Sequence, residues 1–552
     1  MANDAIRAAV EAALGEMGVQ DAEVQLERPR DPSHGDVASN VAMTLARVLK
    51  RAPRQIAEEI AERIDRAAAG VDRVDVAGPG FLNFTLAASA VGSAVDQVLA
   101  ADAAWGRSDA GSGHPVMVEF VSANPTGPLH LGHGRQAALG DAIAALLEWT
   151  GWDVHREFYY NDSGRQMELL ARSVRARYRQ GLGVDEPVPE DGYRGEYVKD
   201  VAESLEAEVG SRYLEDDSDE ALDAVRQHAV RMLRAEQDRD LGDFRVRFDE
   251  YFLESSLYEQ GLVERTIAEL RDTGLVYEKE GATWLRTSEF GDQKDRVMVR
   301  SNGMPTYFLP DVAYHMTKWQ RGFERVINVQ GSDHHGTVDR VRAGLQALGL
   351  PKGYPEYVLH QMVRVVQDGE EVKFSKRAGS GMTLRELYER VGVDVTRYFF
   401  QMRKPDAHLL FDLDVALDQS DKNPVYKVGL EPDEISAGQG DLAVLDHELE
   451  RALIKQLADF PDAVARAAEH TSPHVVCDYL EQTAGAANSW YHAGNPTRNP
   501  ELAVLSDDPV LRGARLALAR AVQIVLRNGL TLLGIDAPSQ MIRDDEDENQ
   551  GS

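Results

Sequence analysis

A buried strand that leads through a loop of proline and glycine into an apolar helix is the feature that most constrains this chain. VMVEFVSA (116–123) is almost continuously apolar, which is typical of a parallel strand covered on both faces. NPTGPLHLGHGR comes next, and AALGDAIAALLEW (137–149) then has helical spacing. Two later strand-like segments, ERVINVQGSD (324–333) and EYVLHQMVRVV (356–366), are separated by a helical segment at 337–348. Strands that alternate with helices predict a doubly wound, Rossmann-like α/β sheet.

The pattern differs on either side of this α/β region. Before a Gly/Ser-rich segment at 105–115, helical periodicity mixes with short strand-like pieces, which predicts an N-terminal α+β domain. After the sheet, apolar residues recur at helical spacing, which predicts an all-helical C-terminal domain followed by an acidic tail. The expected boundaries are 1–107, 108–413 with one helix-rich insertion at about 160–290, 414–541, and 542–552.

Composition limits the kind of protein. Lysine and arginine number 60 against 92 aspartates and glutamates, a formal net charge of −32. Such a charge alone argues against a nucleic-acid partner, but net charge describes the bulk field and not a local surface. Lysine is scarce beside arginine, so we expect an acidic surface of the kind suited to high salt. Cys477 is the only cysteine, and no apolar run approaches the ~20 residues of a membrane helix. We expect a cytoplasmic protein with no membrane partner.

Two histidines, His130 and His133, stand at the start of the expected helix. A helix N-terminus there lies at the carboxyl ends of the strands, where α/β sheets bind ligands and where free N–H groups attract phosphate. Gly132 between them lets a flat ring approach the backbone. The histidines are three residues apart and therefore lie on one face of the helix. Their N–H groups can donate hydrogen bonds to a phosphate oxygen on which negative charge develops in the transition state. Two alternatives stay open: the histidines cap or pack the helix, or they bind a metal together with SDHHG (332–336).

A second polar stretch, KFSKRAGSG (373–381), follows an apolar strand. Lys373, Ser375 and Lys376 precede two glycines, and a flexible lysine loop of this kind can fold over a polyphosphate. The alternative is a solvated basic loop.

HLGH followed far downstream by KFSKR resembles the paired signature of class I aminoacyl-tRNA synthetases. Similarity to arginyl-tRNA synthetase extends over the long stretch around HLGH. It also covers four other segments: HGDVASNVAM, VAGPGFLNF, GATWLRTSEFGDQKDRVMVRSNGMPTYFLPDVAYH and LTLLGIDAPSQM. The similarity covers nearly the whole chain. It implies a Rossmann-like class I catalytic domain with an N-terminal tRNA-binding domain and a C-terminal helical anticodon-binding domain.

The resemblance implies an arginine–tRNA ligase. The carboxylate of arginine would attack the α-phosphate of ATP, and the arginyl group of the resulting adenylate would pass to tRNA(Arg), with release of AMP and pyrophosphate. Arginine, ATP with Mg²⁺ and tRNA(Arg) are therefore the expected ligands. No structural metal is expected, and the family is commonly monomeric.

The resemblance also assigns residues. The implied catalytic set is His130, His133, Lys373, Ser375 and Lys376. The ammonium and carboxylate of arginine would contact Glu119, Ser122 and Asn124, and its guanidinium would contact Tyr307 and Asp311. A carboxylate suits a planar guanidinium, although Asp311 after Pro310 also fits a helix N-cap. The implied ATP contacts are Pro128, Leu131, Gly132, Gly331, Asp333, His360 and Met362. A basic face for tRNA is expected from Arg512, Arg515, Arg520 and Arg527, with solvated arginines as the alternative.

Two departures from the family pattern stand out. Leu309 and Pro310 precede Asp311 where the family typically has Thr-Arg. DKNPVYKVGLEPDEISAG (421–438) is shorter than in relatives, near 427–429, where the anticodon domain begins. Two other functions are therefore kept open: an RNA-binding paralogue with impaired aminoacylation, and another nucleotidyltransferase with a HIGH-type site.

Overall fold

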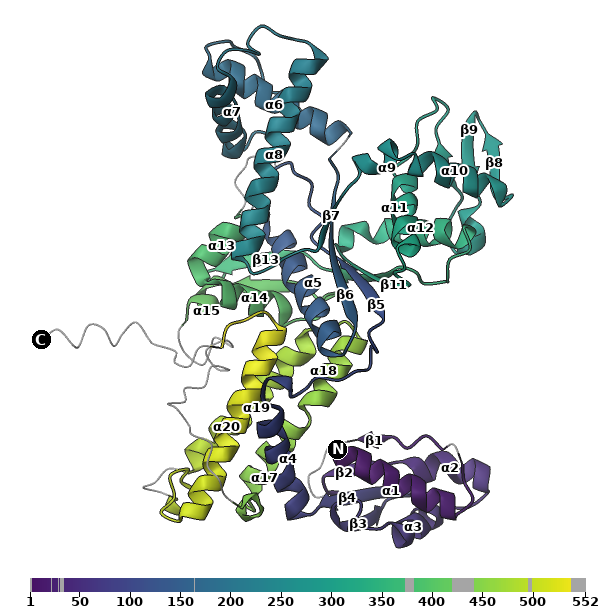
Figure 1. Cartoon of the computed structure of the whole chain (residues 1–552), viewed down its shortest axis with the longest axis vertical. Coiled ribbons are helices and arrows are strands. Elements are labelled where there is room, and N and C mark those ends of the chain that lie inside the picture. The colour runs from purple at the N-terminus through teal and green to yellow at the C-terminus, as the bar shows by residue number, and fades with distance from the viewer. Residues whose placement is uncertain are drawn as a thin grey trace, which may run out of the picture. The chain divides into compact units, whose positions relative to one another are not determined.

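The computed structural model describes residues 2–20, 22–27, 29, 34–162, 164–372, 382–418, 441–494 and 499–537 (Figure 1). The chain divides into two compact units. The first unit comprises Met1–Trp105, Leu430–Phe460 and Gln482–Leu526, and the second comprises Gly106–Gly429, Pro461–Glu481 and Arg527–Ser552. Among the described residues, no helix is both long enough and apolar enough to cross a membrane.

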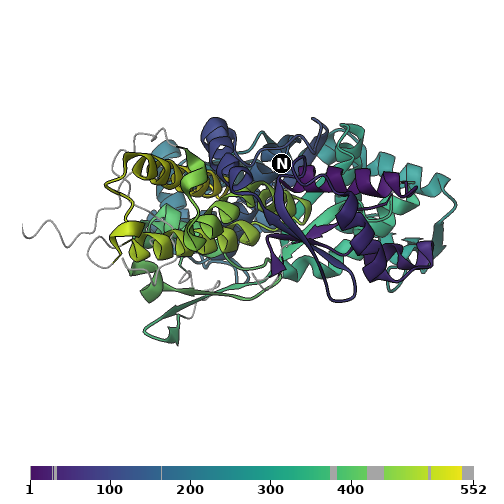
Figure 2. The ribbon, with the colours of Figure 1, turned by 90° about the horizontal axis from the view of Figure 1, so that it is seen from below.

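The first unit begins with the expected α+β domain. Its helices are α1 (Ala2–Glu16), α2 (Val41–Leu49) and α3 (Pro53–Arg63). Its antiparallel sheet has the order β1-β2-β4-β3, with the strands β1 (Leu26–Glu27), β2 (Val37–Ser39), β4 (Phe81–Leu86) and β3 (Val71–Ala77). Figure 2 shows this domain in purple, seen from below, with α1 starting at the marked N-terminus. Apolar side chains of α2, α3 and β4 are buried and form its core.

Helices join this domain within the first unit. α4 (Ala88–Ala101) packs along α17 (Glu448–Ala458). An ion pair joins Lys455 of α17 to Asp36, and Arg451 donates to the backbone oxygen of Leu86 over 3.0 Å. The remaining C-terminal helices are α18 (Phe460–Glu469), α19 (His474–Ala493) and α20 (Pro509–Leu532). The prediction of a helical C-terminal region is thus confirmed for its described residues.

The second unit contains the predicted doubly wound sheet. Five parallel strands have the order β12-β11-β5-β6-β7. The chain enters at β5 (Pro115–Glu119), builds outward through β6 (Asp153–Tyr160) and β7 (Glu250–Leu253), and returns to the other side with β11 (Arg325–Gly331) and β12 (Glu356–His360). The order therefore reverses between β5 and β11, and the crevice at their carboxyl ends is where such sheets bind ligands. α5 (Leu131–Trp149) starts at this point.

The prediction of one insertion at about 160–290 is wrong, because β7 of the parallel sheet lies inside that stretch. Before β7 come the helices α6 (Arg165–Gly181), α7 (Glu196–Val209) and α8 (Asp219–Asp243). After it come α9 (Ser255–Glu259), α10 (Leu262–Asp272) and an antiparallel sheet of β8 (Val276–Lys279), β9 (Ala282–Leu285) and β10 (Arg296–Val299). The strand EYFL has only four residues without clear alternation, so its place depends on pairing with β6.

The segment 356–366 also divides into two strands rather than one. β12 ends at His360, and β13 (Val363–Gln367) pairs instead with β15 (Leu409–Asp412) and β14 (Glu370–Glu371). The second unit also contains the helices α11 (Phe308–Gln320), α12 (His335–Ala347), α13 (Leu384–Val391), α14 (Val393–Gln401) and α15 (Leu413–Leu417).

A fully buried arginine, Arg397 of α14, ties α5 to the end of α20 within the second unit. Its guanidinium pairs with Asp141 of α5 at 2.5 Å and donates to the backbone oxygens of Phe244 (2.9 Å) and Leu533 (3.0 Å). Gly534 has a φ of 66°, and a Cβ there would lie 2.1 Å from Arg397. Glycine is therefore required both for the conformation and for the space.

Candidate active site

The start of α5 is capped by its own histidines. Nδ1 of His130, the N-cap residue, accepts from the backbone N–H of Gly132 (3.1 Å) and of His133 (3.3 Å), and Nδ1 of His133 accepts from the N–H of His130 (3.4 Å). The two rings stack with centroids 3.6 Å apart. A ring nitrogen that accepts cannot carry the proton, so each neutral ring carries it on Nε2. The capping alternative is confirmed, and it leaves the phosphate role open because capping uses Nδ1 and donation would use Nε2.

The loop before α5 begins in strained backbone. Val121 and Ser122 have φ values of 67° and 42°, in the left-handed region that β-branched residues rarely adopt. In the amide orientation that satisfies both of its ends, Gln136 of α5 donates to the backbone oxygen of Val121 (2.9 Å) and accepts from the N–H of Gly331 (3.1 Å). One side chain thus joins the carboxyl ends of β5 and β11. Strain of this kind is typical of ligand sites, where surrounding contacts hold it.

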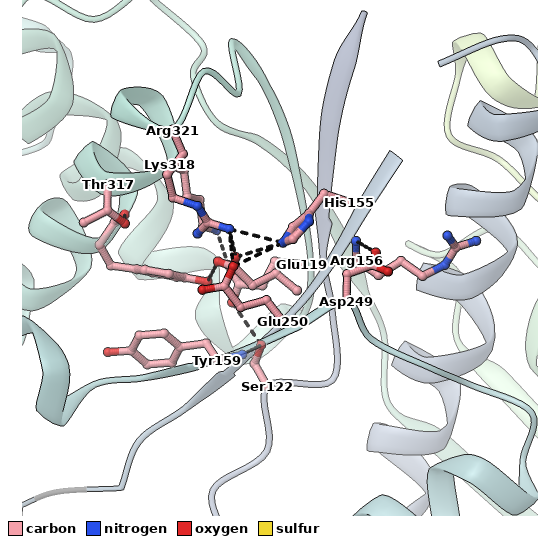
Figure 3. Close-up of polar contacts among 12 residues, drawn as sticks. Glu119, Ser122, His155, Arg156, Tyr159, Asp249, Glu250, Thr317, Lys318 and Arg321 are labelled. Carbon is pink, nitrogen blue, oxygen red and sulfur yellow. Dashed lines mark hydrogen bonds and ion pairs between the residues drawn. The ribbon is translucent and has the colours of Figure 1, made fainter. Parts of the chain in front are cut away.

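Glu119, the last residue of β5, is buried in an ion pair. Its carboxylate accepts from Nζ of Lys318 on α11 (2.5 Å) and from Oγ of Ser122 (3.0 Å), as Figure 3 shows. Lys318 also donates to Oδ1 of Asn328 on β11 (3.1 Å), and the N–H of Tyr159 donates to Ser122 (3.2 Å). The position of Ser122 is therefore determined by two neighbouring strands. Both oxygens of Glu119, which the sequence predicts at the substrate, therefore have partners within the protein.

A second buried carboxylate, Glu157 of β6, lies beside Glu119 in the sheet register. It pairs with Arg321, the C-cap residue of α11 (2.6 Å), and accepts from the hydroxyl of Tyr314 (2.6 Å). Burial opposes its ionisation, but His155, Lys318, Arg321 and Tyr314 together lower the pKa of Glu157 to about 2. This carboxylate is therefore charged at neutral pH.

Glu157 also belongs to a grouping with metal-ligand spacing. Its carboxylate, His155 and Glu250 have ligand atoms within 4.8 Å of one another. Arg321 pairs with both Glu157 and Glu250 (2.7 Å), and it lies against His155 in Figure 3, so this arginine occupies the place of a cation. Within the described part of the chain, neither HLGH nor SDHHG joins such a grouping. The metal alternative drawn from those two motifs therefore gains no support.

Asp311 lies in the first turn of α11 among other carboxylates. Burial and the charges of Glu254 and Glu119 raise the pKa of Asp311 to about 7. The N-cap alternative for Asp311 is wrong, because α11 already begins at Phe308 and its N-cap residue is Tyr307. A cation placed beside Asp311 would relieve the repulsion that raises its pKa.

A neutral histidine fixes the turn that carries Asp311. Nδ1 of His315 donates to the backbone oxygen of Asp311 (2.8 Å), and its Nε2 accepts from Nδ2 of Asn328 (2.7 Å). Burial holds the pKa of His315 well below its usual range, so the ring stays neutral. Sequence reasoning missed His315 and Lys318, although their spacing of four and seven residues from Asp311 places all three on one helix face.

Glu254 was also missed, because it follows a strand that the sequence did not reveal. Its carboxylate accepts from the hydroxyl of Tyr159 (2.8 Å), and burial with nearby carboxylates raises the pKa of that tyrosine far above its usual range. Tyr307, expected at the guanidinium, is 74% exposed at the start of α11.

The other predicted ligand residues surround the same strand ends. Gly331 ends β11, Asp333 follows in a short 3₁₀ turn, and buried His360 ends β12. Burial lowers the pKa of His360 to about 4, so its ring is neutral. Met362 is 57% exposed. Nδ2 of Asn124 donates to Oε1 of Gln166 on α6 (2.7 Å).

Lys373, Ser375 and Lys376 lie outside the described residues, but contacts of Thr383 and Leu384, a few positions later, are described. Thr383 pairs with His130 as an isolated bridge, and the N–H of Leu384 donates to the backbone oxygen of Leu129 (2.8 Å). The start of α13 is therefore held beside HLGH.

The four arginines expected to face tRNA have different environments. Arg515 is 2% exposed, pairs with Glu450 of α17 (2.6 Å) and donates to the backbone oxygen of Ala503 (2.8 Å). The prediction is wrong for Arg515, because a buried carboxylate on the adjacent helix binds its guanidinium. Arg512 is exposed, and Arg520 and Arg527 bond to neighbours on their own helix. The segment near 427–429, which we expect to be shorter than in relatives, lies outside the described residues.

Comparison with known proteins agrees with this arrangement. Three family models match the chain: "Arginyl tRNA synthetase N terminal domain" over residues 2–86, "tRNA synthetases class I (R), catalytic domain" over 94–398, and "DALR anticodon binding domain" over 429–541. The arginine–tRNA ligase of Thiobacillus denitrificans is 49% identical, and the alignment covers 98% of this chain and 99% of the relative. That of Bordetella pertussis is 48% identical over 97% and 98%.

Solved structures give the same result for the fold. Arginyl-tRNA synthetase of Thermus thermophilus superposes with a TM-score of 0.76 at 26% identity, over 98% of this chain and 100% of that one. Methionyl-tRNA synthetase of Mycobacterium tuberculosis shares the fold alone, with a TM-score of 0.54 at 12% identity over 77% of this chain and 92% of that one. The chain belongs to the arginyl-tRNA synthetases, within class I of the aminoacyl-tRNA synthetases.

Proposed function

We propose that this chain activates arginine with ATP and transfers the arginyl group to tRNA(Arg), releasing AMP and pyrophosphate. The observation that carries the proposal is the environment of Asp311. Its pKa is raised to about 7 by burial and by nearby carboxylates, at the strand ends where α5 also starts. A planar, permanently charged guanidinium relieves that repulsion and can bond to a carboxylate through two N–H groups.

The remaining contacts to arginine follow from this placement. Asp311 and Glu254 receive the guanidinium, and Tyr307 at the rim covers it. Glu119 acts through its charge, since Lys318 and Ser122 already bond its oxygens. Asn124 and Ser122 lie on the loop toward α5, and they receive the ammonium and carboxylate of the amino acid.

ATP binds along the start of α5. The Nε2–H groups of His130 and His133 donate to phosphate oxygens as the arginine carboxylate attacks, and Lys373, Ser375 and Lys376 neutralise the leaving pyrophosphate. Mg²⁺ bound to the phosphates adds charge neutralisation. The adenosine lies among Pro128, Leu131, Gly132, Gly331, Asp333, His360 and Met362.

Arginine-dependent exchange of pyrophosphate into ATP tests this function. We expect exchange with arginine and tRNA(Arg) together, and much less without tRNA, as the family implies. Exchange that depends on another amino acid would overturn the specificity for arginine. Absence of exchange under all conditions, in salt where the chain is folded, would favour the RNA-binding paralogue. The matches to the models of the arginyl-tRNA synthetase N-terminal domain and of the DALR anticodon-binding domain argue against a small-molecule nucleotidyltransferase.

We further propose that the enzyme works as a cytoplasmic monomer and that its excess of acidic residues suits high salt. A formal charge of −32 causes repulsion that added salt screens. The melting temperature should therefore rise with added KCl. An unchanged melting temperature between low and molar KCl would contradict the salt proposal without affecting the assigned activity.

A further inference from the structure

We propose that the helical insertion α6–α8 holds the substrate loop, residues 124–128, in the conformation that binds arginine, with Gln237 and Tyr197 as positioning residues. The proposal rests on the proposed function, because it concerns the loop that carries Asn124 between the arginine site and HLGH.

Two buried or half-buried side chains of the insertion bond to the backbone of this loop. Nε2 of Gln237 on α8 donates to the backbone oxygens of Asn124 (3.1 Å) and Gly127 (2.8 Å). The hydroxyl of Tyr197 on α7 donates to the backbone oxygen of Thr126 (2.8 Å). Three of the four carbonyls from Asn124 to Gly127 thus accept from the insertion.

The sequence of the loop explains why it needs outside donors. Pro125 and Pro128 have no N–H, so the segment cannot join a strand ladder or a helix through those residues. Inside the loop, the N–H of Thr126 donates to the backbone oxygen of Asn124 (2.8 Å). Carbonyls in such a loop are satisfied by side chains or by water, and side chains fix one conformation where water would allow several.

Gln237 is built for donation. It is 1% exposed, both of its bonds to the loop come from the amide nitrogen, and Oε1 is buried with no hydrogen-bond partner among the described residues. A buried amide that leaves its oxygen unbonded costs stability, so the two donated bonds are what this side chain contributes.

Tyr197 also determines how close the loop approaches α7. A Cβ built on Gly127 would lie 3.0 Å from the ring of Tyr197, so the glycine permits this contact. Tyr197 packs against the apolar core shared by α6, α7 and α8, where Leu170 and Leu205 are fully buried. The donor groups are therefore carried by a packed three-helix unit.

The insertion also orients the side chain of Asn124. Oε1 of Gln166 on α6 accepts from Nδ2 of Asn124 (2.7 Å). This bond directs the amide nitrogen to the insertion and leaves Oδ1 to accept from the ammonium of arginine. Backbone and side chain of Asn124 are thus both set by the insertion.

The test removes single donors and uses matched controls in the same insertion. Tyr197→Phe and Gln237→Met delete bonds to the loop. Tyr178→Phe deletes a tyrosine bond to the backbone oxygen of Gly210 (2.6 Å) and the bond that this hydroxyl accepts from the N–H of Tyr213 (3.3 Å). Gln180→Met deletes an amide bond to the backbone oxygen of Glu186 (2.5 Å) and the bond accepted from Arg177 (2.9 Å). Both controls act away from the loop.

Two measurements are made on the full-length chain: the KM for arginine and kcat in pyrophosphate exchange with tRNA, and amide hydrogen exchange of the peptide that contains residues 122–131. For Tyr197→Phe and Gln237→Met we expect faster hydrogen exchange in this peptide and a KM for arginine raised about 5- to 20-fold, with kcat changed less. The two control variants should leave both quantities at wild-type values while lowering the melting temperature to a similar degree.

The proposal is overturned if test and control variants raise the KM equally, or if the loop exchanges faster while the KM stays constant. The wild type could show no arginine-dependent pyrophosphate exchange while Tyr197→Phe still speeds amide hydrogen exchange in the loop. That result would refute the proposed function but would confirm that Tyr197 holds the loop. Where Gln237→Met does not fold, Tyr197→Phe, which keeps the ring, decides the matter.

Discussion

The two ends of the candidate site, one proposed to bind phosphate and the other proposed to bind arginine, are built in different ways. At the phosphate end, the residues that cap α5 are His130, Gly132 and His133, which lie within four positions of the sequence. At the arginine end, the charged groups come from β5, β6, α11 and the turn after β7. The first end is local and uses neutral rings, whereas the second gathers buried charges from distant segments.

This difference determines what each end requires of the fold. A helix start supplies its own N–H groups and positive dipole end, so it needs little beyond a cap. Buried carboxylates instead require partners in place before they can stay ionised, and Lys318 and Arg321 are those partners. Asp311 differs from these carboxylates because burial and nearby carboxylates raise its pKa. A raised pKa of this kind is typical of a residue that binds a ligand.

The largest expected effect is a loss of stability when a buried charge at the arginine end is removed. Lys318→Met leaves Glu119 buried without its cation and should lower the free energy of unfolding by about 3–5 kcal/mol. Urea denaturation measures the loss. The double variant Lys318→Met with Glu119→Gln should recover much of it, because no isolated charge remains. A loss below about 1 kcal/mol in the single variant would show that this pair is not structural.

Asp311→Asn separates ligand binding from stability. We expect arginine binding to weaken by about 2–5 kcal/mol, since the guanidinium loses its charged partner. Calorimetric titration with arginine, or the KM in pyrophosphate exchange, measures this change. Asp292→Asn is the control: it removes a buried carboxylate bonded to Arg296 (2.7 Å), so it should cost stability and leave the arginine KM unchanged. An unchanged KM in Asp311→Asn would show that Asp311 does not bind the guanidinium.

At the phosphate end, two substitutions of His130 separate the cap from the chemistry. His130→Ala loses both the cap of α5 and the proposed hydrogen bond to phosphate. It should therefore reduce kcat of pyrophosphate exchange about 100-fold or more. His130→Asn restores an N-cap acceptor, so it should recover about 1 kcal/mol of stability without recovering kcat. Full activity in His130→Asn would mean that this histidine only caps the helix.

The smallest effect is a pH dependence. Burial and nearby carboxylates raise the pKa of Asp311 to about 7, and the proposed contact with the guanidinium of arginine requires the ionised carboxylate. Affinity for arginine should therefore rise as pH increases to 7, by about tenfold per unit below that value, and then level off. Stability should change in the opposite direction, because the folded state holds this proton more tightly than the unfolded chain between about pH 4 and 7. Asp311→Asn should remove both contributions, and persistence of either slope in that variant would assign it to another group.

The sequence predicted the local end far better than the distant one. HLGH after a buried strand was enough to predict a helix N-terminus at the carboxyl ends of the parallel strands. The strand order confirms this position. The ion pair of Glu119 with Lys318 could not be predicted, because the two residues lie 199 positions apart in the sequence and meet only in the folded chain. Glu254 was missed because β7 is too short to reveal a strand. Arg515 was misjudged because helical spacing does not show that Glu450 faces it.

The bond from Arg397 to the backbone oxygen of Leu533 has a consequence for the order of synthesis. Leu533 lies 136 residues after Arg397, so this acceptor leaves the ribosome well after the strands of the sheet. Until then the guanidinium has Asp141 and Phe244 as partners but not the oxygen that Gly534 allows to approach. The core around α5 is therefore completed only after Leu533 has been synthesised, and a chain that stops before this residue leaves Arg397 without one of its buried acceptors.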